Sequence, residues 1–150
     1  MSRPDPIRPW IVAIAVLALL HHADHVLRAD HSGWPFQPEV TPFTYTLIIY
    51  LMLVVDYFAR SRPRLRAGLL SLGVVLLLGV HLTIETPSDL YKTWATGAST
   101  SEANPGVSNL LGVSSPLLGI VSNVVLAGLL AALIITIVKV LRRARAAPAP

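Results

Sequence analysis

The chain has 150 residues, of which 53% are hydrophobic and 13% are charged, and its mean hydropathy is +0.62. This composition is too apolar for a soluble domain of this length and predicts a membrane protein. No nucleic-acid partner is expected from the formal net charge of +4, because the basic residues flank apolar runs. The absence of cysteine excludes disulfides, thiolate catalysis, Cys-ligated zinc and iron–sulfur clusters.

Four segments are apolar enough to cross a bilayer, which requires about 20 residues of helix. They cover residues 10–29, 43–59, 67–85 and 116–141. The sequence therefore predicts an all-α membrane protein with one four-transmembrane-helix bundle over residues 1–145, followed by a disordered tail at 146–150. A cleaved signal peptide is a weaker interpretation of the first span, because His21 and His22 stand where the small residues of a cleavage site would be needed.

The distribution of charge predicts the orientation of the bundle. Residues 60–66 form a short turn with four arginines, which is typical of a cytoplasmic connection. With this turn inside, the inner side carries ten basic and two acidic residues, and the outer side carries two basic and six acidic residues. The expected protein is a multi-pass protein of the cell membrane with both termini in the cytoplasm. Asp56 and Arg60, four residues apart, are expected to form an ion pair at the inner end of the second span.

The second outer loop, residues 86–115, contains two different patterns. Leu90, Tyr91 and Trp94 share one helical face, which predicts a helix lying at the membrane surface. The following stretch, residues 96–109, is rich in Gly, Ser, Thr and Asn and is typical of a flexible loop or a lid.

Ionisable residues are concentrated near the outer end of the first span. His21, His25 and Arg28 follow one another at spacings of four and three and share one helical stripe, and His22 lies three residues before His25. Such residues are costly inside a membrane and are therefore candidates for function.

The other spans place polar side chains at nearly the same depth. Measured from the basic residue at each inner end, the polar layer lies 15 to 17 residues along each helix, or roughly 22 to 26 Å at the rise of an α-helix. The layer contains His21, His22 and His25; Tyr45 and Thr46; His81; and Ser122 and Asn123. Further out, Arg28 and Glu85 are level and opposite in charge, which predicts an ion pair at the rim.

Several imidazoles and a carboxylate, without Cys or a nearby Met, favour Zn(II), Fe(II) or Mn(II) over Cu(I). The expected metal ligands are His21, His22, His25, His81 and Glu85, with His25 and His81 as the core pair. The candidate catalytic groups are Asp24, Glu85 and Tyr45, and the expected substrate pocket adds Arg28, Asp30, His31, Trp34, Thr46, Ser122 and Asn123. The sequence thus predicts an outward-facing, metal-dependent site that acts on a lipid-soluble molecule.

Three alternatives remain open. The histidines can hydrogen-bond across helices without a metal, and two of them can be axial ligands of a b-type haem in an electron-transfer protein. The third is metal-free, isomerase-like acid–base chemistry or ligand binding. Transport fits less well, because the inner halves of the spans are almost purely apolar. Membrane lipid is the expected partner, and a homodimer is possible.

Overall fold

The computed structural model describes residues 5–28, 42–100 and 105–146. Within these residues the chain forms six helical segments and no extended strand, which confirms the all-helical prediction. The segments are α1 (Arg8–Arg28), α2 (Pro42–Thr46), α3 (Ile48–Phe58), α4 (Pro63–Thr83), α5 (Pro87–Thr96) and α6 (Pro116–Ala146).

Helices α1, α4 and α6 are long and apolar enough to cross a membrane, whereas the apolar helix over Thr44–Phe58 is shorter. The expected continuous second span is therefore wrong in detail, because the helix tightens at Leu47 and divides into α2 and α3. The Tyr50 N–H donates to the Leu47 carbonyl at 3.1 Å, a three-residue spacing typical of a 3₁₀ turn. The threonines beside this turn are weak helix formers, since their branched side chains lose rotamer freedom in a helix.

Two helix boundaries also differ from the prediction. Helix α4 begins at Pro63, ahead of the expected start at residue 67, because proline at the first helical position needs no hydrogen bond and has a helical φ. Helix α6 continues to Ala146, past the expected end at residue 141, through alanines and arginines that favour helix. The remainder of the expected tail, residues 147–150, lies outside the described residues.

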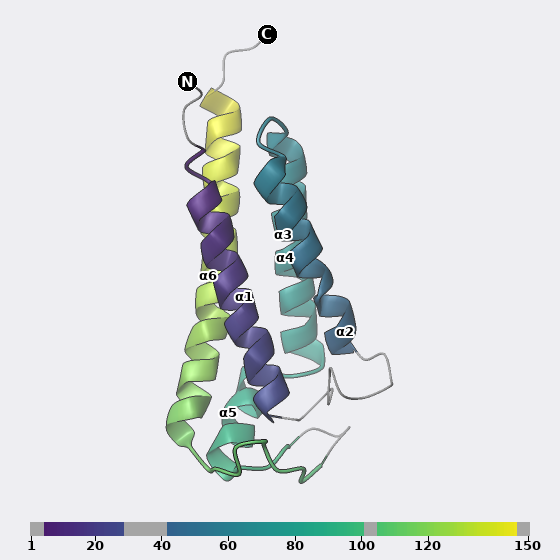
Figure 1. Cartoon of the computed structure of the whole chain (residues 1–150), viewed down its shortest axis with the longest axis vertical. Coiled ribbons are helices and arrows are strands. Elements are labelled where there is room, and N and C mark those ends of the chain that lie inside the picture. The colour runs from purple at the N-terminus through teal and green to yellow at the C-terminus, as the bar shows by residue number, and fades with distance from the viewer. Residues whose placement is uncertain (1–4, 29–41, 101–104, 147–150) are drawn as a thin grey trace.

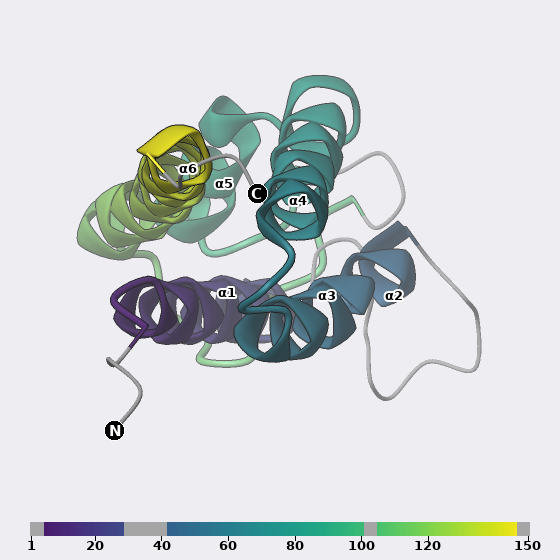
Figure 2. The same ribbon diagram turned by 90° about the horizontal axis from the view of Figure 1, so that it is seen from above.

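The helices form a bundle in which the start of α1, the end of α6 and the connection between α3 and α4 lie at one end (Figure 1). Helix α6 packs against α1, α4 and α5, and α3 packs against α1 and α4. Viewed along the bundle, α1 and α3 lie opposite α6 and α4 (Figure 2). Their shared core contains Ile11, Ile14, Leu70, Leu129 and Leu133.

Large apolar side chains cover much of the outside of the bundle. Leu19, Val54, Val75, Leu82 and Val124 are each more than half exposed. Such faces are unfavourable in water and favourable in lipid, which agrees with helices that lie in a membrane.

Helix α5 closes the end of the bundle opposite the chain ends. It begins with a capping box between Thr86 and Asp89. Leu90 and Trp94 are almost fully buried, so the apolar face that was expected on the membrane surface packs on the bundle instead. Gly119 of α6 permits this contact, because a Cβ there would lie 2.8 Å from the carbonyl oxygen of Tyr91.

We expect Gly119→Ala to displace α5 from α6 and to lower the free energy of unfolding by about 1–3 kcal/mol, the usual cost of overpacking. Thermal unfolding in mild detergent, followed by tryptophan fluorescence, measures the loss. The matched control is Gly79→Ala in α4, where a Cβ meets nothing within 4 Å among the described residues. Equal melting temperatures for the two variants would contradict the close contact at Gly119.

The loop after α5 is more ordered than a flexible lid in its described part. The side-chain amide of Asn109 donates to the carbonyls of Gly97 at 3.2 Å and Val113 at 2.7 Å. The backbone N–H of Leu110 donates to the carbonyl of Leu27 at 2.8 Å, which ties the loop to the end of α1. A buried asparagine thus organises a sequence whose composition suggested flexibility.

The expected ion pair between Asp56 and Arg60 is absent among the described residues, and Asp56 contacts Arg66 instead. Helix α3 ends at Phe58, and Ala59 leaves helical geometry with ψ at 35°. Arg60 therefore does not continue the helical face of Asp56. The Arg66 Nε donates to Asp56 Oδ1 at 3.4 Å from the first turn of α4.

Candidate metal centre

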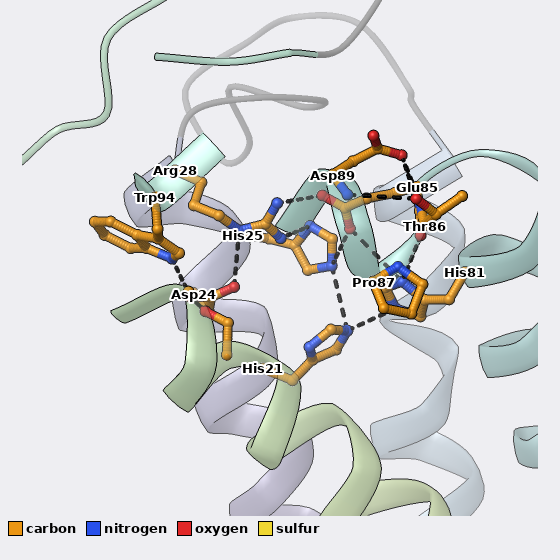
Figure 3. Close-up of polar contacts among 12 residues, drawn as sticks. His21, Asp24, His25, Arg28, His81, Glu85, Thr86, Pro87, Asp89 and Trp94 are labelled. Carbon is orange, nitrogen blue, oxygen red and sulfur yellow. Dashed lines mark hydrogen bonds and ion pairs between the residues drawn. The ribbon is translucent and has the colours of Figure 1, made fainter. Parts of the chain in front are cut away.

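Three buried histidines meet between α1 and α4 (Figure 3). Helix α1 places His21 and His25 one turn apart, and the last turn of α4 places His81 opposite them. The Nε2 atoms of His21 and His81 are 2.9 Å apart, and those of His21 and His25 are 3.2 Å apart. One ring nitrogen from each residue lies within 4.8 Å of the others, so the three can hold a metal ion. Two nitrogen ligands of a tetrahedral ion with bonds of about 2.0–2.1 Å lie about 3.3 Å apart, close to these spacings.

The backbone fixes the tautomer of His81. Its Nδ1 lies 3.0 Å from the carbonyl oxygen of Glu85, and a carbonyl only accepts hydrogen bonds. The hydrogen of neutral His81 is therefore on Nδ1, and Nε2 presents its lone pair toward His21. Such a second hydrogen bond orients many metal-binding histidines.

Arg28 fixes the tautomer of His25 in the opposite sense. The Arg28 Nη2 lies 3.1 Å from His25 Nδ1, and a guanidinium only donates. Neutral His25 therefore carries its hydrogen on Nε2, where it can donate to His21 Nε2. The single lone pair of His21 Nε2 can accept from His25, or a hydrogen on His21 Nε2 can donate to the lone pair of His81 at 2.9 Å. A metal ion bound here would replace these hydrogens and be held by the nitrogen lone pairs.

The acidic groups beside the histidines also favour a cation. Arg28 is completely buried and bonds both Asp24, through Nε at 2.8 Å, and Glu85, through Nη1. One guanidinium and two carboxylates give these described groups a net charge of −1 when the histidines are neutral. Glu85 lies just beyond the end of α4, with Oε2 3.4 Å from His25 Nε2. The expected pair of Arg28 and Glu85 is therefore present, but it is buried and not at a rim.

Asp24 joins the first helix to α5 and α6. Its Oδ1 accepts hydrogen bonds from the indole of Trp94 at 2.8 Å and from the hydroxyl of Ser122, while Oδ2 accepts from Arg28. Both oxygens are thus used in holding helices together and in orienting the guanidinium. Trp94 belongs to the helical face that was expected at the membrane surface, and the structure gives its indole this direct partner.

His22 lies apart from the three converging imidazoles. Its Nδ1 is 2.7 Å from the hydroxyl of Tyr50, and its Nε2 is 3.0 Å from the hydroxyl of Thr46. Tyr50 did not stand out in the sequence, although it follows Thr46 by four residues on the same side of the chain. Tyr45, which was expected at this level, is 72% exposed.

Four other expected pocket residues lie away from the cluster or beyond the described part of the chain. Asn123 donates to the backbone carbonyls of Pro87 and Gly119 at 3.1 Å and 3.0 Å, so it supports the contact between α5 and α6. Asp30, His31 and Trp34 lie outside the described residues.

A cavity of about 170 Å³ adjoins the histidines. The imidazoles of the cluster, His22, Thr46 and Glu85 supply its polar lining. Its apolar lining comes from α1, α3, α4 and α6 and includes Ile49, Leu77, Val80, Leu129 and Leu133. The site therefore combines several nitrogen and oxygen groups with space for an apolar molecule.

The spacing of His21 and His81 does not suit these two residues as the axial pair of a b-type haem. Two axial ligands of a haem approach the iron from opposite sides, with their nitrogens separated by about 4 Å, twice a metal–nitrogen bond of about 2.0 Å. The His21 and His81 nitrogens are 2.9 Å apart, which leaves no room for a porphyrin plane between them.

No protein-family model matches the chain, and comparison with curated proteins and with solved structures gives no significant match. The function is therefore inferred from the residues of the site.

Proposed function

We propose that this chain is a four-span membrane metalloenzyme that binds Zn(II), Fe(II) or Mn(II) and acts on a lipid-soluble molecule. The ion is held by His21, His25 and His81, with Glu85 beside it. The observation that carries the proposal is the convergence of three buried histidines, with the Nε2 atoms of His21 and His81 2.9 Å apart.

The donor set supports this choice of metals. Imidazole and carboxylate groups without sulfur suit these three ions. The net negative charge of the described buried groups favours a cation over a neutral ligand. His81 presents its Nε2 lone pair, and His21 Nε2 lies 2.9 Å from it, whereas the His25 ring becomes a ligand only when its Nε2 hydrogen is lost or Arg28 releases its Nδ1. We therefore assign His21 and His81 as the principal ligands and His25 as the weaker one.

The cavity supports a lipid-soluble substrate. Leu77, Val80, Leu129 and Leu133 would contact an apolar body, and the polar groups of the cluster would meet its reactive end. A bound metal ion would polarise a substrate oxygen or activate water. The carboxylate of Glu85, whose Oε2 lies 3.4 Å from His25 Nε2, is placed to hold and exchange a proton at this end of the cavity.

The charge distribution supports the orientation in the cell membrane. The arginines of residues 60–66 and of the end of α6 lie at one end of the bundle, and the histidines lie toward the other end (Figure 1). Retention of basic residues in the cytoplasm would place the metal centre toward the extracytoplasmic side.

Elemental analysis of the protein, purified in mild detergent with a tag that contains no histidine, tests the proposal. We expect close to one equivalent of zinc, iron or manganese per chain, either as isolated or after incubation with each ion. Organic extracts of the same sample, analysed by mass spectrometry, should contain an apolar molecule that is missing from a cavity-filling Leu77→Trp variant. Failure to retain any of the three ions would contradict the metal centre, and identical extracts would contradict the substrate class.

A further inference from the structure

A second cavity, of about 670 Å³, lies at the end of the bundle that carries the α3–α4 connection. Its charged lining comes from Arg60, Arg66, Arg143 and Asp5, with the hydroxyl of Ser61 among the other groups. These residues belong to three separate parts of the chain, so the fold assembles the site. The metal centre uses none of them.

Arg66 forms the buried side of this cavity and is only 3% exposed. Its Nη1 donates to Asp5 Oδ2 at 2.8 Å, and its Nε donates to Asp56 Oδ1 at 3.4 Å. Its Nη2 is buried and has no hydrogen-bond partner among the described residues. A buried guanidinium nitrogen without a partner is costly, and a ligand oxygen would satisfy it.

The acidic group in the cavity is already neutralised. Burial acts to raise the pKa of Asp5, but the hydrogen bond from the Ile7 N–H and the guanidinium of Arg66 outweigh it and hold the pKa below its usual value. Asp5 is therefore a carboxylate paired with Arg66, and Arg143 lies 3.9 Å from its other oxygen. The lining groups, three arginines and one aspartate, carry a net charge of +2.

The start of α4 adds to this positive character. Pro63 and Arg66 of its first turn line the cavity, and the cap residue Arg62 makes no side-chain hydrogen bond to the helix end. The positive end of the helix dipole therefore lies beside the three arginines. Phosphate groups bind readily where a helix start and guanidinium groups converge.

We propose that this basic cavity binds a phosphate group, supplied by an anionic phospholipid of the surrounding membrane. Arg66 donates from the buried side through Nη2, and Arg60 and Arg143 donate from the rim. The cavity lies at an end of the apolar helices, where lipid headgroups would meet the protein. Inorganic phosphate shares the same chemistry and is the alternative source that the experiment separates.

The test compares two double variants that each remove two positive charges. Arg60→Gln/Arg143→Gln alters the cavity rim, and Arg64→Gln/Arg142→Gln alters exposed arginines that do not line the cavity. Native mass spectrometry and thermal unfolding in detergent are carried out with phosphatidylglycerol, with phosphatidylcholine and with inorganic phosphate. Arg66→Lys, which keeps the charge but lacks the second terminal nitrogen, is measured in parallel.

We expect phosphatidylglycerol to bind the wild type and the Arg64/Arg142 variant similarly, and the Arg60/Arg143 variant about tenfold or more weakly. Arg66→Lys should also weaken binding. Protection by inorganic phosphate alone, with the same dependence on the variants, would support the site and assign its ligand to the soluble anion. Equal losses in the two double variants, or no preference for phosphatidylglycerol over phosphatidylcholine, would overturn the proposal.

Discussion

His21→Ala and His81→Ala are each expected to weaken metal binding by at least about 100-fold. The basis is that both residues place Nε2 at the same point, with the two atoms 2.9 Å apart. Removal of groups that only orient a ligand commonly costs 10- to 100-fold in affinity, and loss of a ligand itself should cost at least the upper value. His25→Ala should weaken binding less, by about tenfold, because Arg28 holds the hydrogen of that ring on Nε2.

The control for this prediction is His22→Ala, adjacent to His21 in the sequence. His22 bonds Tyr50 and Thr46 and does not join the three converging nitrogens, so its variant should retain the metal. Competition with a chromophoric chelator measures the metal affinities of the four histidine variants in detergent. Loss of metal from His22→Ala as severe as that from His21→Ala would contradict the assigned ligands.

Arg28→Met is expected to lower the free energy of unfolding by about 3–5 kcal/mol, the usual cost of breaking a buried ion pair. Arg28 is fully buried between Asp24 and Glu85, and Glu85 is 1% exposed. Without the guanidinium, two carboxylates remain in a confined environment with no compensating cation nearby among the described groups. Reversible unfolding in mixed micelles, followed by circular dichroism, measures this loss.

A double-mutant cycle with Glu85→Gln tests the cause of that loss. The single variant Glu85→Gln should cost less than Arg28→Met, because glutamine still accepts a hydrogen bond and removes one negative charge. Combining the two changes should cost at least about 1 kcal/mol less than the sum of the single effects. Additive effects would show that Arg28 and Glu85 are not coupled. They would contradict the proposal that this pair sets the charge of the site.

The sequence was informative where local pattern decides the structure. The long apolar helices follow from hydropathy, and the helical segment α5 follows from the shared face of Leu90, Tyr91 and Trp94. The depth comparison also brought Arg28 and Glu85 together correctly, since both lie near the ends of regular helices. Counting residues along an uninterrupted helix is reliable because the rise per residue is constant.

The same counting failed where the helix was not regular. The second span tightens at Leu47, and the structure brings Tyr50 to His22 where Tyr45 was expected. Helical spacing also could not show which of His21 and His22 joins the cluster. That depends on how α1 is rotated against α4. The partners of Asp24 on α5 and α6 depend on the same long-range packing, which no local pattern encodes.

X-ray absorption spectroscopy at the zinc K-edge of the zinc-loaded protein tests the metal centre most directly. The account predicts nitrogen ligands at about 2.0–2.1 Å with the outer-shell scattering of imidazole rings. It further predicts that this imidazole signal is lost in His21→Ala and in His81→Ala and is retained in His22→Ala. A first shell of oxygen atoms without imidazole, or a spectrum unchanged by the His21 and His81 variants, would contradict a metal centre at these histidines.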